Sequence, residues 1–333
     1  MNTLTLAARG KSFFPGLMAC GVVAAAATFL SEHYGAPVML FALLLGLAMN
    51  FLSGEGACAP GIAFTARELL RLGVALLGLR ITLTQVQHLG WPPVLIVLIS
   101  VVVTISVSML VARMMGFQAI FGLLTGGATA ICGASAALAL AAALPAHEQK
   151  ERATLFTVIG VSALSTLAMI VYPMLVRALD LDPSAAGIFL GGTIHDVAQV
   201  VGAGYSLSHE TGDVATLVKL MRVATLLPVI VFAAAITRAR GVAPGSERPP
   251  LLPWFAVGFL LLMLVNSTGF VPVAVQKLGT GLSQWCLVAA MAGIGMKTQL
   301  KDVITVGFKP VALMLGETVL LAGLVLGLMK VMH

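Results

Sequence analysis

The chain has 333 residues, of which 59% are hydrophobic and only 10% are charged, and its formal net charge is +6. Soluble globular proteins carry about 25% charged residues and disordered chains are poor in apolar ones, so both classes are excluded. Four cysteines are too sparse for a disulfide scaffold, and the mean hydropathy of +1.04 predicts an all-α polytopic membrane protein.

Apolar segments close to the roughly 20 residues of a spanning helix follow one another along the chain. Eleven are predicted, near Phe13–Leu30, Val38–Leu52, Thr65–Leu79, Pro92–Met115, Ile120–Leu144, Thr154–Ala178, Ala185–Ser206, Lys219–Thr237, Trp254–Val275, Ser283–Met296 and Phe308–Val331. The loops between them are short, so residues 1–333 are expected to form a single transmembrane transporter domain. Residues 238–252, rich in proline, glycine and arginine, are the expected linker between its halves.

The basic residues predict an orientation in the membrane. With the N-terminus in the cytoplasm, twelve lysines and arginines fall on the cytoplasmic side and seven on the other. That bias follows the positive-inside rule, and an odd number of spans puts the C-terminus on the opposite side. No basic patch interleaved with aromatic residues is present, so no nucleic-acid partner is expected.

An internal repeat is predicted from residues that mark bends and helix ends; Asn50, for example, aligns with Asn266. The predicted copies are residues 37–111 and 253–328, and central helices without an aligned partner occupy residues 117–237. The copies are an odd number of spans apart, so they would have opposite orientations in the membrane. Inverted-topology repeats recur in secondary transporters.

Two segments, Gly126–Ser135 and Gly191–Gly204, differ from the uniformly apolar spans. Each places a Gly-Gly pair inside a span and follows it with small polar residues. A glycine pair lets a helix break, and the N–H groups freed at the new N-terminus suit an anion. Interrupted spans are the best sequence pointer to a transporter binding site. Close packing of helices through small residues is the alternative, and it weighs most for the first segment.

The second segment also contains His195 and Asp196. Ionisable residues inside a membrane are costly and are functional-site candidates by default, although a satisfied interhelical hydrogen bond is the structural alternative. Histidine titrates near physiological pH, so this pair would carry a proton or set the charge of the empty site. The predicted substrate-binding residues are Gly126, Gly127, Thr129, Cys132, Gly133, Ser135, Gly191, Gly192, Thr193, His195, Asp196 and Gln199.

Three further ionisable residues are candidates for coupling or for attracting an anion. Glu317 lies in the last predicted span, where it would carry a proton or form a helix-to-helix bond. Lys219 and Arg222 lie at a predicted span entrance, where they would snorkel to the interface or draw an anion inward. The cysteines show no C-x-x-C pairing and no histidine at metal-ligand spacing, so no metal or other cofactor is expected.

Three segments resemble signature segments of the YeiH family of proposed sulfate exporters. They are Ala-Ile-Cys-Gly-Ala-Ser-Ala at 130–136, Ile-His-Asp-Val-Ala-Gln-Val-Val at 194–201 and Arg-Leu-Gly-Val-Ala-Leu-Leu-Gly-Leu-Arg at 71–80. Asp196 stands where the family more often has glutamate. The resemblance implies an uncharacterised bacterial inner-membrane protein whose fold is similar to that of cation–proton antiporters and bile-acid transporters. It implies little about the substrate.

These observations predict a secondary transporter of a small anion (sulfate, a sulfonate or a small carboxylate), ion- or proton-coupled and working by alternating access. A cation–proton antiporter with Asp196 as the ion or proton carrier is the first alternative, and a non-transporting membrane receptor or structural protein is the second. No enzyme is expected, since the chain has no H-E-x-x-H motif and no P-loop. The expected partners are a small anionic solute and the lipid bilayer, and a homodimer is left open.

Overall fold

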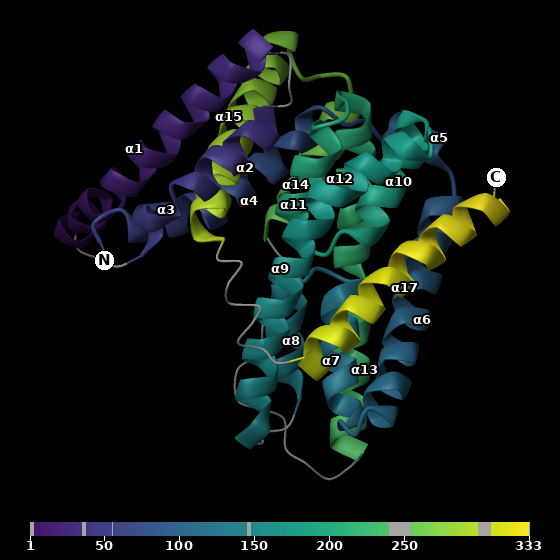
Figure 1. The fold of residues 1–333 in the computed structure, drawn as a ribbon. Coiled ribbons are helices and arrows are strands. Elements are labelled where there is room, and N and C mark those ends of the chain that lie inside the picture. Colours follow the sequence, from purple (N-terminus) through teal and green to yellow (C-terminus); the bar gives the residue numbers. More distant parts are fainter. Residues whose placement is uncertain are drawn as a thin grey trace. The chain divides into compact units, whose positions relative to one another are not determined.

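The computed structural model describes residues 3–34, 38–54, 56–144, 148–239, 254–298 and 308–332. Every regular element within these ranges is a helix, so the prediction of an all-α protein is confirmed (Figure 1). Most of the predicted linker, residues 240–252, lies outside them. The chain divides into two compact units, the first within Met1–His88, Tyr205–Leu207 and Pro253–Gln299, and the second within Leu89–Gly204, Ser208–Leu252 and Leu300–His333.

The first unit holds the N-terminal helices and one later helix pair. Its elements are α1 (Thr3–Tyr34), α2 (Val38–Ala48), η1 (Asn50–Ser53), α3 (Ala59–Phe64), η2 (Thr65–Leu69), α4 (Leu70–Leu76), η3 (Leu77–Leu79), α14 (Trp254–Ser267) and α15 (Val273–Lys297). Helix α5 (Leu83–Leu89) lies where the first of its three ranges ends. Helix α15 packs against α1, α2 and α4. Glycine permits the closest of these contacts, because a Cβ atom on Gly295 would lie 2.3 Å from the carbonyl oxygen of Leu43.

The second unit contains all of the predicted site residues. Its helices are α6 (Pro92–Met114), α7 (Ala119–Ala130), α8 (Ala134–Ala143), α9 (Glu148–Ala178), α10 (Pro183–Thr193), α11 (Val197–Tyr205), α12 (His209–Ala224), α13 (Leu226–Ala239) and α17 (Phe308–Met332). Helix α6 packs along α7 and α17, and α10 packs along α12. Figure 1 shows α17, in yellow, running past α6 and α7.

Six helices among the described residues are long and apolar enough to cross a membrane, against eleven predicted spans. They are Ser12–Tyr34, Pro92–Met114, Ala153–Ala178, His209–Ala233, Val273–Lys297 and Phe308–Met332. The prediction counted interrupted segments as continuous. The apolar runs near Ile120–Leu144 and Ala185–Ser206 are each two short helices, because the backbone leaves the helical conformation between them. The protein is a multi-pass membrane protein with broken helices.

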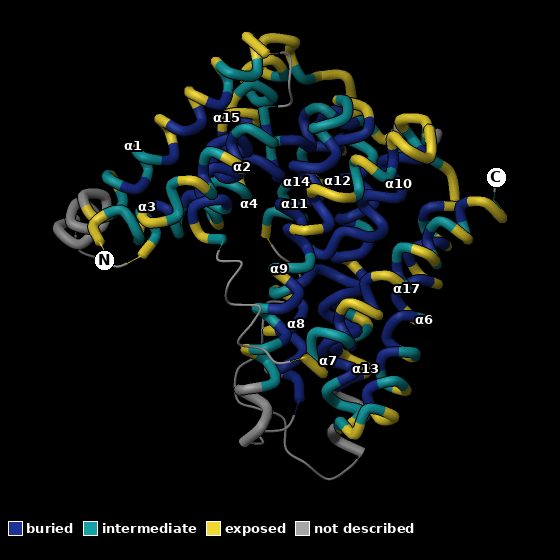
Figure 2. The backbone as a smooth tube through the Cα atoms, viewed as in Figure 1, coloured by how far each residue is buried: buried dark blue, intermediate teal, exposed yellow. Residues whose placement is uncertain are grey.

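Burial separates two kinds of helix in the second unit. On α6, large apolar side chains point outward; Val102 is 63% exposed and Leu110 is 60% exposed. By contrast, α10 is buried from Ala185 to Thr193 and α11 from Val197 to Gly204 (Figure 2). An outward apolar face suits contact with lipid, whereas a helix buried all round belongs to a core. The broken helices therefore form the core of the second unit.

Candidate functional site

The first break separates α7 from α8 at residues 131–133. Helix α7 ends at Ala130, and Ile131 leaves the helical region at φ −111° and ψ −82°. Gly133 follows with φ +65° and ψ −132°, a conformation that L side chains rarely adopt. Gly133 is also the N-cap of α8, and glycine has no side chain that can accept from the first-turn N–H groups. The N-terminus of α8 therefore has no cap from its N-cap residue, although the Cys132 side chain contacts the backbone N–H of Ala136 in the first turn.

The second break separates α10 from α11 at residues 194–196. Helix α10 ends because Ile194 is extended, with ψ 138°. Asp196 then caps α11, since its Oδ1 accepts from the backbone N–H of Ala198 at 2.9 Å. Ser165 of α9 fixes the turn by accepting from the N–H of Asp196 at 3.0 Å. The two breaks are neighbours, because a Cβ atom on Gly133 would lie 3.6 Å from the carbonyl carbon of His195.

The Gly-Gly pairs do not form the breaks, contrary to the prediction. Gly126 and Gly127 lie within α7, and Gly191 and Gly192 lie within α10. They serve close packing instead. A Cβ atom on Gly126 would lie 2.5 Å from the Cβ of Ser108, and one on Gly191 would lie 2.4 Å from the carbonyl oxygen of Ala215. Each pair lets a neighbouring helix approach, and the helix ends after it, with the break beginning at Ile131 in one case and at Ile194 in the other.

Lys219 and Arg222 lie deep inside the second unit, not at a span entrance. Helix α12 begins at His209, where the Oγ of Ser208 accepts from the N–H of Thr211 at 3.0 Å. The spanning helix therefore starts about ten residues earlier than predicted, since its span is His209–Ala233. The i, i+3 spacing puts both cations on one face of α12, and both are 0% exposed.

Both cations bind the backbone of the two breaks. Lys219 Nζ donates to three carbonyl oxygens, those of Ile131 at 2.7 Å, Ile194 at 2.9 Å and His195 at 2.5 Å. Arg222 donates to four, those of Ala130 at 2.8 Å, Thr129 at 2.9 Å, Gly191 at 3.1 Å and Ile194 at 3.0 Å. Terminal carbonyls of a helix lack helical partners and carry partial negative charge, so the cations satisfy them. Within the described residues, neither cation forms an ion pair with a carboxylate.

Glu317 is surrounded by hydroxyl groups. Its side chain on α17 is 3% exposed. Three hydroxyls lie within hydrogen-bond distance of it: Ser108 Oγ on α6 at 2.5 Å, Thr125 Oγ1 on α7 at 2.7 Å and Thr129 Oγ1 on α7 at 3.0 Å. The sequence identified Glu317 and Thr129 but missed Ser108 and Thr125. The one signal was that both are polar residues inside an apolar helix. Serine and threonine often occur there because their hydroxyl groups bond to backbone carbonyl oxygens of the same helix.

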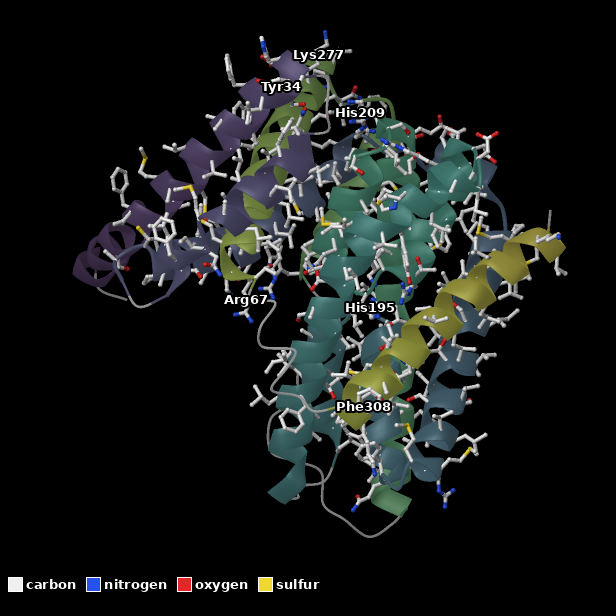
Figure 3. The ribbon with its side chains drawn as sticks, viewed as in Figure 1. Tyr34, Arg67, His195, His209, Lys277 and Phe308 are labelled. Carbon is white, nitrogen blue, oxygen red and sulfur yellow. The ribbon has the colours of Figure 1, made fainter. Side chains whose placement is uncertain are left out.

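His195 connects the second break to α17, next to which it lies in Figure 3. Its Nε2 lies 2.9 Å from Thr318 Oγ1. Thr318 donates its one hydroxyl hydrogen to the carbonyl oxygen of Met314 at 2.8 Å, so the histidine must donate from Nε2. Nδ1 of neutral His195 is then an acceptor. Among the described residues neither that atom nor Gln199 Oε1 has a hydrogen-bond partner, although both are buried.

The buried centre consists of Lys219, Arg222, His195, Asp196 and Glu317. The remaining predicted residues differ in how close they lie to it. Cys132 is buried inside the first break. Ser135 is exposed in the first turn of α8, and Ala134 beside it is half-buried, so this helix N-terminus is accessible. Thr193 bonds within its own helix, donating to the carbonyl oxygen of Phe189 at 2.6 Å, and does not enter the centre.

Comparison with known proteins gives matches over nearly the whole chain. A family model described as conserved hypothetical protein 698 matches residues 15–314. A UPF0324 membrane protein of Chlorobaculum tepidum is 55% identical over 321 residues, covering 96% of this chain and 90% of that protein. The UPF0324 membrane protein TauZ of Paracoccus denitrificans is 53% identical over 315 residues, covering 94% and 93%.

A UPF0324 membrane protein of Rhizobium meliloti is 50% identical over 319 residues, covering 95% of this chain and 92% of that protein. No solved structure matches the chain. The resemblance to the YeiH family is confirmed, since YeiH and these relatives are one family. The chain belongs to the conserved hypothetical protein 698 family, the family of the UPF0324 membrane proteins.

Proposed function

We propose that this protein is a secondary transporter of a small anion, namely sulfate, a sulfonate or a small carboxylate, and that it works by alternating access. The observation that carries the proposal is the uncapped N-terminus of α8 beside two buried cations. Non-helical backbone at membrane depth is tolerated only inside protein or along a cavity, and broken helices mark the binding sites of many transporters. The predicted inverted repeat, antiporter-like fold and inner-membrane location with a cytoplasmic N-terminus belong to this proposal.

Charge favours an anion when one carboxylate of the buried centre is protonated. The half negative charges at the C-terminal ends of α7 and α10 are offset by the half positive charges at the N-terminal ends of α8 and α11, so the two positive charges of Lys219 and Arg222 are opposed only by Asp196 and Glu317. Most of the hydrogens on these cations are already bonded to carbonyl oxygens. They would therefore attract the anion through their field rather than hold it directly.

The direct donors would come from the first turn of α8. Its N–H groups follow Gly133, which offers no side chain to cap them, and Ser135 adds a hydroxyl. The same position on the other broken helix is occupied, because Asp196 caps α11. Helix N-termini that lack a cap are ready-made anion sites. The fully buried His195 lies beside this turn, and its Nδ1, an acceptor in the neutral ring, could accept from a hydrogen-bearing group of the solute or from a water molecule.

Two contacts weigh against the cation–proton antiporter. The backbone carbonyl oxygens that would coordinate a sodium ion at the breaks instead accept from Lys219, whose ammonium group stands in their midst. One carboxylate oxygen of Asp196, the proposed ion carrier, accepts a helix-capping bond. A site already filled by a tethered cation has little affinity for a second one.

The test is flux in proteoliposomes that contain the purified protein. Radiolabelled sulfate, methanesulfonate and acetate are offered in turn, with empty liposomes as the background. We expect at least one anion to enter faster than in empty liposomes, and His195→Ala to slow that flux. Lys309→Met, at an exposed position on α17, is the matched control and should retain the wild-type rate. Background flux for every anion, or a pH change on adding sodium ions, would overturn the proposal.

A further inference from the structure

Building on the proposed function, we propose that Glu317 is the proton-binding residue of this transporter, and that its protonation and the binding of a monovalent anion favour each other. The solute and the proton would then move together, in the same direction. The hydrogen-bond pattern around Glu317 and the charges of the buried centre carry this inference.

The hydroxyl groups around Glu317 can serve both of its protonation states. With the carboxylate ionised, Ser108, Thr125 and Thr129 donate to it. Two of these hydroxyls also have a carbonyl oxygen within reach: Ser108 Oγ lies 2.7 Å from Gly122 O, and Thr125 Oγ1 lies 3.2 Å from Phe121 O.

When a proton from solvent joins a carboxylate oxygen of Glu317, the new O–H group can donate to Ser108 Oγ. Ser108 then turns its own hydrogen to the carbonyl oxygen of Gly122, and Thr125 can turn to that of Phe121. No buried polar group loses its partner in either state. A buried polar group without a partner carries a free-energy penalty, and the rotating hydroxyl groups avoid that penalty in both protonation states.

The charges of the centre couple this proton to an anion. Lys219 and Arg222 carry two positive charges, and Asp196 and Glu317 carry two negative ones when ionised. The centre is formally neutral in that state, with His195 neutral. A proton on Glu317 leaves one positive charge in a buried site, and a monovalent anion restores neutrality. Each event therefore lowers the cost of the other.

Hydrogen bonds connect Glu317 and its neighbour Thr318 to the cation pair and to the second break. Thr129 donates to Glu317 through its hydroxyl, and its carbonyl oxygen accepts from Arg222 at 2.9 Å. The next residue on α17, Thr318, accepts from His195. One residue, Thr129, thus lies between Glu317 and Arg222 in the hydrogen-bond network, and Thr318, the chain neighbour of Glu317, contacts the second break.

Other titratable groups on the helices packed against α17 are few. Helices α7 and α10 carry none, and α9 has no charged residue between Ala153 and Val176, though Tyr172 lies there. Helix α6 carries Arg113, exposed in its last turn. On α17 itself, Lys309 and Lys330 are exposed. His195, reached through Thr318, is accordingly the main competitor as the proton site.

The first measurement uses the unmodified protein in detergent. Acetate or methanesulfonate binding is followed by calorimetry in buffers of different ionisation enthalpy, which reports how many protons are taken up with the anion. We expect about one proton per monovalent anion at a pH where Glu317 is ionised, and an affinity that rises by about 5–150-fold as the pH falls, the usual range for coupled sites. Anion binding without proton uptake would overturn the inference.

The second measurement compares Glu317→Gln with His195→Gln. Glutamine imitates the protonated glutamate, so Glu317→Gln should bind the anion with high affinity at every pH and without proton uptake. It should still exchange anion across the membrane but lose accumulation driven by a pH gradient. His195→Gln should keep the proton uptake. The reverse result, with uptake lost only in His195→Gln, would overturn the inference.

Failure of this inference differs from failure of the proposed function. If no anion binds or crosses the membrane, the proposed function fails. If an anion binds and is transported with no proton taken up, only the role of Glu317 fails. Should Glu317→Gln not fold, the proton uptake of the unmodified protein still decides the question.

Discussion

Two buried polar clusters in the second unit handle charge in opposite ways. Lys219 and Arg222 bind backbone carbonyl oxygens, which are held by two helix ends and have no freedom to turn. Glu317 binds hydroxyl groups, each of which rotates about one bond and has either role available. The first cluster stabilises two fixed positive charges, whereas the second can accommodate Glu317 in either its ionised or its protonated state.

The difference assigns separate tasks to the clusters. A cation that uses nearly all its hydrogens on fixed backbone holds the two breaks together and cannot exchange partners without unfolding them. A carboxylate in a rotating shell can change its charge within an intact fold. Substitutions in the first cluster should therefore damage stability, whereas neutral substitutions in the second should change coupling and leave the fold.

Replacing Lys219 with methionine should have the largest effect. Two buried carbonyl oxygens, those of Ile131 and His195, would lose their donor, while Arg222 would still donate to that of Ile194; each unsatisfied group costs about 1–3 kcal/mol. The sum is a large part of the 5–15 kcal/mol that typically separates folded from unfolded proteins. We expect loss of the monodisperse peak in size-exclusion chromatography, or a strongly lowered melting temperature. Lys309→Met, at an exposed site, should behave like wild type; equal melting temperatures would contradict a structural role for Lys219.

Thr129→Val tests the residue that the two clusters share. The change removes one of three hydroxyl groups from Glu317 and leaves the carbonyl bond to Arg222 in place. A hydrogen bond to a charged group is worth about 1.5–3 kcal/mol, so the ionised form of Glu317 should be destabilised by up to that amount. The pH at which anion affinity changes should rise, with only a modest fall in melting temperature.

The matched control for that variant is Thr157→Val on α9. Thr157 is also fully buried, but its hydroxyl donates to the carbonyl oxygen of Ala153 in its own helix at 2.8 Å. It should leave the pH profile of anion binding unchanged. A shift of the profile in both variants would mean that general loosening of the unit, not the bond to Glu317, moves it.

Sequence reasoning located the breaks to within a few residues but assigned them to the wrong glycines. Gly133 was the informative one, because its positive φ requires glycine, whereas the Gly-Gly pairs are explained by packing. In a single sequence, a glycine required for a positive φ cannot be distinguished from a glycine required for close packing of helices. Lys219 and Arg222 did give a signal: two cations inside an apolar helix, with no acidic residue three or four positions away from either, must find buried acceptors.

The hydroxyl cluster could not have been predicted. Ser108 and Glu317 are separated by 209 positions in the chain, and their contact depends on how α6 packs against α17. Apolar helices of similar composition give no pairing signal, so the sequence supplied the candidates and not their neighbours. The same holds for His195 and Thr318, which are separated by 123 positions.

Gly133→Ala sharpens the contrast between the two breaks. A side chain at φ +65° is strained by about 1–3 kcal/mol, and the first break should become less stable by that amount. Gly323→Ala on α17 is the matched control, since a Cβ atom there meets nothing within 4 Å. We expect a lower melting temperature and weaker anion binding for Gly133→Ala alone. An unchanged melting temperature would show that the break does not need the positive φ.

Substitutions of Asp196 should have the smallest effect. They distinguish a role of this residue in capping α11 from a role as an ion carrier. Asp196→Ala removes the oxygen that accepts from Ala198 and should cost about 1 kcal/mol, the usual loss for an N-cap. Asparagine caps helices about as well as aspartate, so Asp196→Asn should keep the wild-type melting temperature although its charge is gone. With the negative charge removed, the centre gains one positive charge and should bind the anion more tightly at high pH. If Asp196→Asn instead abolishes all transport while it melts like wild type, the carboxylate is itself the carrier, and the antiporter alternative regains its place.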